Sequence, residues 1–178
     1  MKVYLASWFA SLHEIQTRAN ELRAQGIEVT SRWLEEKVAP TTAITDVSAE
    51  YLRDTAMVDI HDILLADTLV LNTPSPEDLK RTDMSISTWA RGGRHFEAGF
   101  QYATMVFFNL LPKRIQDRGP RRLVLVGHRE NVFHYLDIAG LNGFADSLSL
   151  PAIPCYPTWD EAKKFLVMQS ENELVAAK

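Results

Sequence analysis

Residues 68–72 read Thr-Leu-Val-Leu-Asn, and this run decides the fold class of the chain. Its apolar side chains follow one another without alternating with polar ones, which is typical of a strand in a parallel sheet covered on both faces. The next residues, 73–76, read Thr-Pro-Ser-Pro. They end the strand because proline cannot donate to a strand ladder. We therefore expect residues 68–72 to form a central strand with helices on both faces of its sheet.

Two strands and two helices are expected before this central strand. The short apolar run Val3–Ala6 reads as a strand, and residues 11–25 carry apolar side chains at helical spacing and end at Gly26. Residues 27–33 alternate with period two and predict a second strand. Residues 34–45 have no clean period, which predicts a loop long enough to act as a substrate lid. A helix capped by Ser48 then runs to about Ala66.

Beyond the central strand the same alternation continues. The sequence predicts a polar loop over 74–91, a helix over 94–111 opened by Gly92-Gly93, a strand over 123–126 and a helix with the capping box Thr158 and Glu161. This order implies a parallel sheet with helices on both faces, in one α/β domain of flavodoxin-like or Rossmann-like type spanning residues 1–178. Ligands of such sheets bind beyond the carboxyl ends of the strands.

Composition narrows the class of protein. The 178 residues include 19 Lys and Arg against 23 Asp and Glu, a formal charge of −4, which argues against a broad nucleic-acid-binding face. Cys155 is the only cysteine, so a disulfide framework is excluded and a reducing, cytoplasmic setting is expected. No window approaches the ~20 apolar residues of a membrane helix, and Val3–Ala10 is interrupted by Ser7 and does not fit a signal peptide.

Common cofactor and metal motifs are missing. The sequence has no GxGxxG after its first strand and no GxxxxGK[ST], which argues against dinucleotide and ordinary nucleoside triphosphate binding. His95-Phe96-Glu97 matches half of a zinc deaminase signature, but the P-C-x-x-C half is absent. His128 and His134 have no third ligand at helical spacing. We expect no cofactor and no metal.

Carboxylates remain as the candidate reactive groups. Glu97 lies in the first turns of the helix that Gly92-Gly93 opens, where the helix dipole favours its ionised form. Asp59, Asp62 and Asp67 lie near the end of the preceding helix. Two carboxylates in one cleft are the equipment of glycosidic bond cleavage, one as nucleophile and one as acid. From spacing alone, the alternative stands that Glu97 is an ordinary helix-start residue and that the aspartates are solvated.

Three stretches resemble a known family. In this order, Lys2–Phe9, Asp59-Ile60 with Ala66–Leu71, and Gly92–Phe100 are similar to the nucleoside 2-deoxyribosyltransferase superfamily. That superfamily includes nucleoside deoxyribosyltransferases and related nucleotide N-glycoside hydrolases, and the resemblance covers roughly residues 2–136. It implies an enzyme that acts on a small nucleoside or nucleotide. A module of the same fold that only senses a nucleotide is the alternative of another class.

The resemblance also implies roles for single residues. Glu97 falls on the family's nucleophile, which attacks C1′ of the sugar, and Tyr4 falls on the tyrosine that orients this glutamate. Asp59 falls on the aspartate that contacts the base or assists its protonation, although Asp62, about one turn away, stays open as the acid. Whether water or a second base completes the reaction is also left open, so hydrolase and transferase both remain.

Substrate contacts are predicted around these residues. The acidic residue that family transferases usually carry several positions before the glutamate is missing here, which removes the family's contact to the 5′-hydroxyl. Arg91 and Arg94 flank a glycine pair at a helix N-terminus, an anion cradle that favours a substrate with a 5′-phosphate, although ordinary solvated charge is the alternative. The substrate-binding candidates are Trp8, Phe9, Asp67, Arg91, Gly93, Arg94 and Asn131.

Two further expectations concern surfaces. The helix from Phe96 to Leu111 is apolar nearly all round, whereas a helix that covers a sheet needs only one apolar stripe. The second stripe indicates a buried helix or a subunit interface, and we predict a homo-oligomer. The basic run over residues 113–122 is expected to be a solvated connector because the chain as a whole is acidic.

Overall fold

The computed structural model of the chain describes residues 1–7, 11–35, 48–73, 93–110, 121–127 and 153–176. Within them the helices are α1 (Leu12–Ala24), α2 (Ala49–Leu65), α5 (Gly93–Leu110) and α8 (Trp159–Ala176), with a short 3-10 helix η2 (Arg32–Glu35). The strands are β1 (Lys2–Ala6), β2 (Glu28–Val29), β3 (Thr68–Asn72), β4 (Arg122–Val126) and β5 (Cys155–Tyr156). Within these ranges no helix is long and apolar enough to cross a membrane.

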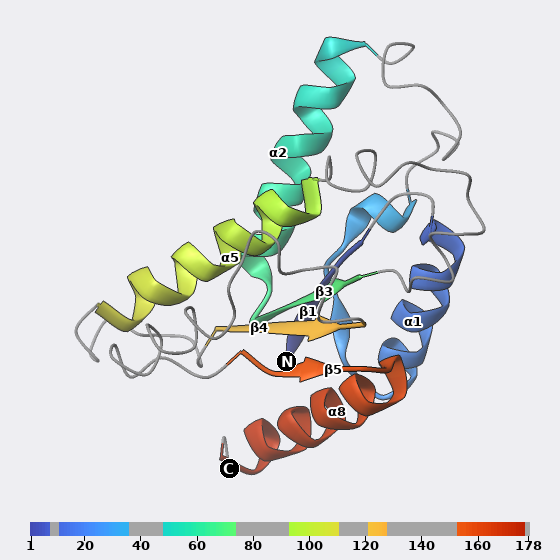
Figure 1. Cartoon of the computed structure of the whole chain (residues 1–178), viewed down its shortest axis with the longest axis vertical. Helices are drawn as coiled ribbons and strands as arrows, with labels where there is room; N and C mark the ends of the chain where they lie inside the picture. The colour runs from blue at the N-terminus through green and yellow to red at the C-terminus, as the bar shows by residue number, and fades with distance from the viewer. Residues whose placement is uncertain (8–10, 36–47, 74–92, 111–120, 128–152, 177–178) are drawn as a thin grey trace.

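The five described strands form one parallel sheet in the order β2-β1-β3-β4-β5 (Figure 1). The predicted α/β class with a parallel sheet is confirmed. β3 lies in the middle, paired with β1 from Val3 opposite Thr68 and with β4 from Thr68 opposite Arg122. All five residues of β3 are buried, as an apolar run without alternation predicts.

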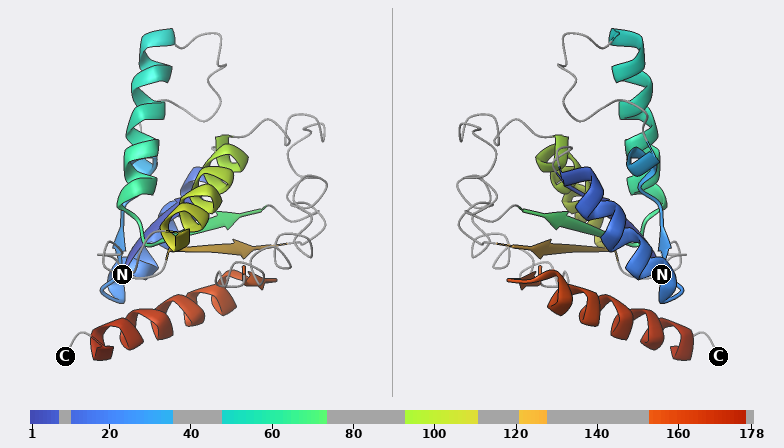
Figure 2. Two further views of the ribbon diagram at one scale, coloured as in Figure 1. Left: turned by 90° about the vertical axis from the view of Figure 1, so that its left-hand side faces the viewer. Right: turned by 90° about the vertical axis from the view of Figure 1, so that its right-hand side faces the viewer.

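Helices cover both faces of this sheet. α2 and α5 lie on one face and α1 and α8 on the other, so that α5 stands in front of the strands in one view and α1 in the opposite view (Figure 2). Side chains alternate between the faces, so Tyr4 of β1 points toward α2 and α5 while Leu5 points the other way. This alternation decides which β1 side chain can meet α5.

The helix signals read from the sequence act as predicted. Gly26 follows α1 with a φ of 75°, a conformation that a side chain disfavours. The Ser48 hydroxyl accepts a hydrogen bond from the backbone N–H of Tyr51 at 3.1 Å at the start of α2. Thr158 does the same for the N–H of Glu161 at 3.4 Å at the start of α8. Local side-chain chemistry thus explains where these helices begin or end.

Two strand predictions are corrected. The strand expected over residues 27–33 is confined to Glu28–Val29, and η2 follows it. Ser31 and Trp33 are buried and bond to the backbone of Leu5 in β1 through their side chains, which removes them from the ladder. β5 was not predicted, because two residues between Pro154 and Pro157 are too few to show a period.

The end of the basic run is also corrected. Arg121 is buried, and its guanidinium donates to the carbonyl oxygens of Ile63, Leu64 and Ala66 at 3.2, 2.6 and 2.9 Å. These carbonyls belong to the C-terminal end of α2, which carries unsatisfied acceptors and partial negative charge. Arg122 pairs with Glu173 of α8 at 2.7 Å. Residues 113–120 lie outside the described residues, but Arg121 and Arg122 are structural rather than solvated.

Candidate active site

Tyr4 and Glu97 meet on the α2 and α5 side of the sheet. The hydroxyl of Tyr4 donates to Oε1 of Glu97 at 2.9 Å, joining residues that are 93 positions apart in the sequence. Tyr4 is fully buried in β1, and Glu97 lies in the second turn of α5. The structure therefore brings together two of the residues that the sequence proposed for catalysis, and holds them by a charge-assisted hydrogen bond.

The electrostatic surroundings keep Tyr4 a hydrogen-bond donor. Burial is the largest cause that raises the pKa of its hydroxyl, and the negative charges of Glu97, Asp59 and Asp62 raise this pKa further. Each of these effects penalises the phenolate. The hydroxyl therefore stays protonated throughout the neutral pH range, where it can fix the orientation of the Glu97 carboxylate.

Asp59 and Asp62 have different surroundings although both lie on α2. Asp62 is only 1% exposed, and its carboxylate accepts hydrogen bonds from the backbone N–H and the Nε of Arg32 at 2.9 and 2.8 Å. This carboxylate is committed to fastening η2 to α2. Asp59 is half-buried, and its charge reaches the Tyr4 hydroxyl. Of the two aspartates, Asp59 is thus the one better suited to meet a substrate.

Asp67 lies elsewhere. It precedes β3, and its Oδ2 accepts a hydrogen bond from the backbone N–H of Lys2 at 2.7 Å, at the amino ends of the strands. Ligands of parallel sheets bind at the opposite, carboxyl edge. The predicted substrate contact of Asp67 is corrected to a structural one, because its carboxylate satisfies the first N–H of β1.

Several predicted contacts fall outside the described residues. These are Trp8, Phe9, Arg91 and Asn131, together with His128 and His134. Gly93 is the first residue of α5 and Arg94 the second, so their backbone forms the first turn of the helix that carries Glu97. In the described part of the chain, no three His, Cys, Asp or Glu side chains are grouped as metal ligands.

A polar cluster that the sequence did not single out lies at the carboxyl end of β3. The side-chain amide of Asn72 donates to the carbonyl oxygen of Ala6 in β1 at 3.1 Å and accepts a hydrogen bond from Arg18 of α1. The Arg18 guanidinium also lies 5.2 Å from the ring centroid of Trp159. β1 and β3 flank the point where the strand order reverses, so this cluster borders the expected ligand crevice. Its one sequence signal is a polar residue that ends an apolar strand.

Gly127 closes the same edge of the sheet between β3 and β4. Its φ is 111°, and an added Cβ would lie 2.3 Å from the carbonyl oxygen of Thr73. Thr73 in turn donates through its hydroxyl to the carbonyl oxygen of Val126 at 2.9 Å. Only glycine allows this close approach of the two strand ends. The edge that faces the expected ligand is therefore closely packed.

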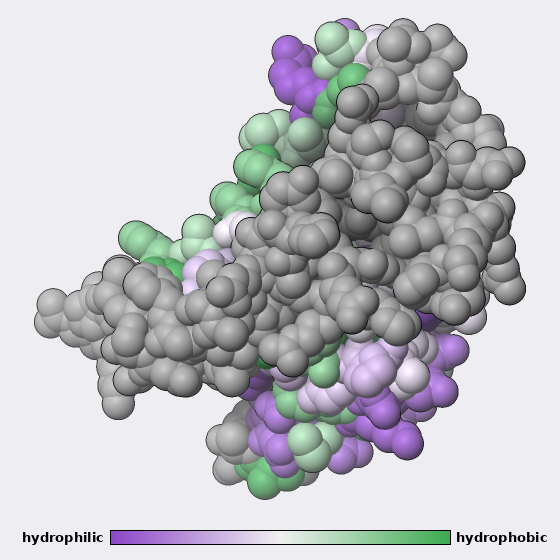
Figure 3. Space-filling view, in the orientation of Figure 1, coloured by the Kyte–Doolittle hydropathy of each residue, from purple (hydrophilic) through white to green (hydrophobic). Residues whose placement is uncertain are grey.

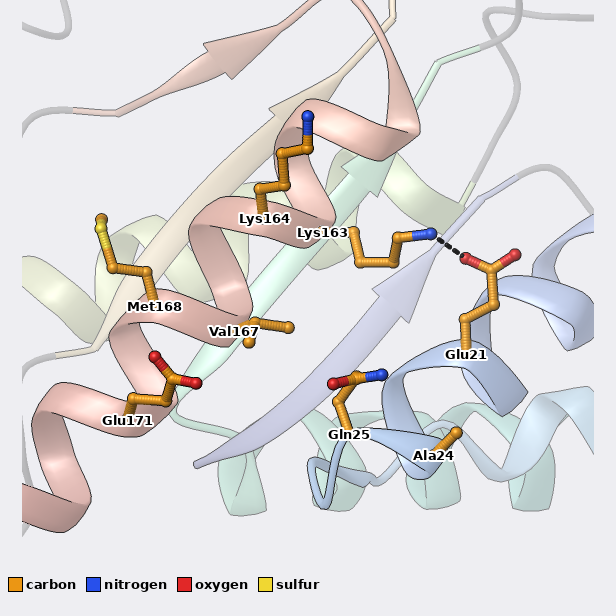
Figure 4. Close-up of a pocket in the computed structure, with 8 residues that line it drawn as sticks. All are labelled: Glu21, Ala24, Gln25, Lys163, Lys164, Val167, Met168 and Glu171. Carbon is orange, nitrogen blue, oxygen red and sulfur yellow. Dashed lines mark hydrogen bonds and ion pairs between the residues drawn. The ribbon is translucent and has the colours of Figure 1, made fainter.

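The cavity between α1 and α8 is separate from these residues. It measures about 410 Å³, and Lys163 points across it to Glu21 at 2.7 Å (Figure 4). Its wall also includes Val167 and Met168. Because α1 and α8 cover the other face of the sheet, this cavity has no access to the Tyr4 hydroxyl or to Glu97.

Comparisons with known proteins give little further information. No family model matches the chain, and no curated protein matches it. Among solved structures, it is similar to the CMP N-glycosidase BcmB of Clostridium botulinum, at 15% sequence identity and a TM-score of 0.44, over 95% of this chain and 99% of the other. A likeness at this level carries no conclusion about activity.

Proposed function

We propose that the chain is an enzyme that cleaves or exchanges the N-glycosidic bond of a 2′-deoxynucleoside or of a nucleoside 5′-monophosphate. The observation that carries this proposal is the 2.9 Å hydrogen bond from the buried Tyr4 hydroxyl to Glu97. A carboxylate that reacts at carbon must be ionised and held in one orientation. A tyrosine kept protonated by burial and by three carboxylates supplies that orientation.

The proposed reaction begins with attack of the Glu97 carboxylate on C1′ of the sugar. A C1′–O bond forms as the C1′–N bond breaks, and the electron pair of that bond passes to the nitrogen of the base. The base leaves readily only when it receives a proton, and Asp59 in its protonated form is our candidate donor. Water or a second base then attacks C1′ and gives its proton to the Asp59 carboxylate, while the ester bond breaks and the Glu97 carboxylate is restored. Two displacements at C1′ retain its stereochemistry.

Substrate recognition is proposed to involve the start of α5. Backbone N–H groups in the first turn of a helix favour an anion, and α5 begins with Gly93 and Arg94. We propose that these residues, with Arg91, bind a 5′-phosphate. Trp8, Phe9 and Asn131 remain proposed contacts to the base and the sugar.

Base release tests this function directly. The purified chain is incubated with deoxynucleosides, nucleoside 5′-monophosphates and deoxynucleoside 5′-monophosphates, with and without a second free base. Chromatography then follows release and exchange, and mass spectrometry of the acid-quenched protein seeks a sugar ester on Glu97. We expect release from at least one class and an adduct of one sugar unit. Failure of every substrate to release or exchange its base refutes the enzymatic proposal and leaves a binding module.

Substitutions of the two aspartates of α2 should have different effects, one on activity and the other on stability. Asp59→Asn is expected to lower kcat about 100-fold, the low end of what general acid catalysis contributes, with little change in stability. Asp62→Ala should instead lower the free energy of unfolding by about 1–3 kcal/mol, because the backbone N–H of Arg32 loses its buried acceptor. Steady-state kinetics and urea denaturation of both variants measure this. The assignment is wrong if Asp59→Asn unfolds the chain while Asp62→Ala alone loses activity.

We also propose that a second copy of the chain covers the outer face of α2 and α5. Met57 on α2 and Phe96 and Phe107 on α5 are 61%, 62% and 61% exposed, and hydrophobic residues run along this side of the molecule (Figure 3). Large exposed apolar patches are rare on monomers. Light scattering should give a multiple of 20.2 kDa, and Phe107→Glu should shift it toward 20.2 kDa while Val175→Glu on α8 does not. A wild-type mass of 20.2 kDa contradicts this proposal.

A further inference from the structure

A second cavity lies between η2 and α2, on the same side of the sheet as Glu97. It measures about 260 Å³. Its walls combine two aromatic rings, a guanidinium, a carboxylate, a hydroxyl and one aliphatic side chain. The lining residues are Arg32, Trp33, Tyr51, Asp54, Thr55 and Val58. Pockets for whole drug-sized ligands measure about 300–1,000 Å³, so this one suits a single ring system.

One ring of the aromatic wall is held by a hydrogen bond. Trp33 is buried, and its indole N–H donates to the carbonyl oxygen of Leu5 at 2.8 Å. Tyr51 adds a second ring from the first turn of α2, where its backbone N–H is capped by Ser48. Two aromatic rings lining a small cavity favour a planar ligand that can stack.

The polar groups of the cavity are equally well placed. The guanidinium of Arg32 is held through its Nε and Nη2 nitrogens, which contact Asp62 at 2.8 and 2.7 Å, and Nη2 also lies 3.2 Å from Nδ1 of His61. In a guanidinium held in this orientation, the Nη1 donors suit the carbonyl oxygens or ring nitrogens of a heterocycle. Asp54 and Thr55 add oxygen atoms on the same wall, and these can accept hydrogen bonds from the exocyclic amino groups of a base.

The cavity also lies beside the candidate catalytic residues. Leu5, which anchors Trp33, directly follows Tyr4 in β1, and its N–H donates to Ser31 at 2.6 Å. Val58, on the cavity wall, directly precedes Asp59, whose charge reaches the Tyr4 hydroxyl. Because α2 runs against the strand direction, its first turns lie toward the carboxyl edge of the sheet, where ligands bind.

We propose that this cavity binds the base that leaves C1′, as a planar nitrogen heterocycle stacked on Trp33 and Tyr51 and read by Arg32. The assignment rests on the proposed function, since it names where the leaving group of that reaction is held. In this proposal α2 contributes to the site twice. Asp59 faces Tyr4 and donates the proton, and the residues of α2 that line the cavity bind the base. The choice of base is then set by Arg32, Asp54 and Thr55.

Free bases serve as the probe. Binding of adenine, guanine, cytosine and thymine is measured by calorimetry and by saturation-transfer NMR, with 2-deoxyribose as the comparison. Tyr51→Ala removes a ring, and Thr55→Trp fills the cavity. Both should raise the dissociation constant of the preferred base roughly tenfold or more, as loss of a stacking contact does. Met57→Trp, on the exposed side of the same helix, should leave base binding unchanged.

The outcomes keep this inference apart from the proposed function. If the wild-type chain binds no base, or if Tyr51→Ala and Thr55→Trp bind it as well as the wild type, the cavity assignment is overturned even when base release is observed. If base binding depends on these residues but no substrate is ever cleaved, the cavity assignment holds and the enzymatic proposal fails. Circular dichroism and urea midpoints confirm that each variant is folded.

Discussion

Glu97→Gln is expected to lower kcat for base release by roughly 10⁴-fold, about 5 kcal/mol of transition-state stabilisation. An amide has no charge to form the bond to C1′, so the covalent step is lost while the shape of the side chain is kept. The fold should be unaffected, because Glu97 lies at the edge of the core and the amide oxygen still accepts from Tyr4. Progress curves of base release measure the effect. The product of enzyme concentration and incubation time must be about 10⁴-fold larger for the variant than for the wild type, so that the slower reaction can be detected.

Two further variants make this test specific. Tyr4→Phe removes the 2.9 Å hydrogen bond to Glu97 and nothing else of the ring, so we expect a 10- to 100-fold loss in kcat with little change in KM. Glu171→Gln, on the wall of the distant cavity between α1 and α8, should be fully active. Glu97→Gln with wild-type kcat, or an equal loss in Glu171→Gln, would remove Glu97 from the mechanism.

Arg121→Ala is expected to cost about 3 kcal/mol of unfolding free energy, since three carbonyl oxygens at the end of α2 lose the hydrogen bonds that the buried guanidinium donates, and a cavity opens. Stability lost in this way is a large share of the 5–15 kcal/mol of a typical domain. Urea denaturation should show a lower midpoint with an unchanged m value.

Two matched variants distinguish the hydrogen bonds that Arg121 donates to the end of α2 from the effect of any positive charge. Arg121→Lys keeps a cation but offers fewer donors in a fixed geometry, so it should recover part of the loss. Arg53→Ala removes an exposed arginine of α2 that pairs with exposed Asp54, and should change stability by less than about 0.5 kcal/mol. A loss below 1 kcal/mol in Arg121→Ala would mean that water satisfies the end of α2.

Much of the fold followed from short-range patterns. Residues 68–72 predicted a central strand and form β3, and Ser48 and Thr158 predicted helix starts that their hydroxyls in fact cap. These predictions held because the signals depend on neighbours within a few residues. β5 was not predicted because two residues are too few to show a period. The strand predicted to reach Trp33 ends early because the side chains of Ser31 and Trp33 hydrogen-bond to the backbone of β1.

The candidate site was predictable only in part. The resemblance of Gly92–Phe100 to a known family singled out Glu97, and that of the first strand singled out Tyr4. No sequence pattern distinguished Asp59 from Asp62, because both are acids on one helix. Arg32 distinguishes them in the structure by occupying the carboxylate of Asp62. Asp67 looked like a neighbour of the site and lies instead at the opposite edge of the sheet.

By itself, the sequence determined the α/β class, the parallel sheet with β3 in its middle and the ends of several helices, because strand and helix periods and caps are local. The tertiary structure alone decided which polar groups meet. Tyr4 and Glu97 are 93 residues apart, and Arg121 reaches a helix that ends more than 50 residues earlier. Such contacts depend on which face each strand presents and on how the crossing helices pack, and no local pattern carries that information.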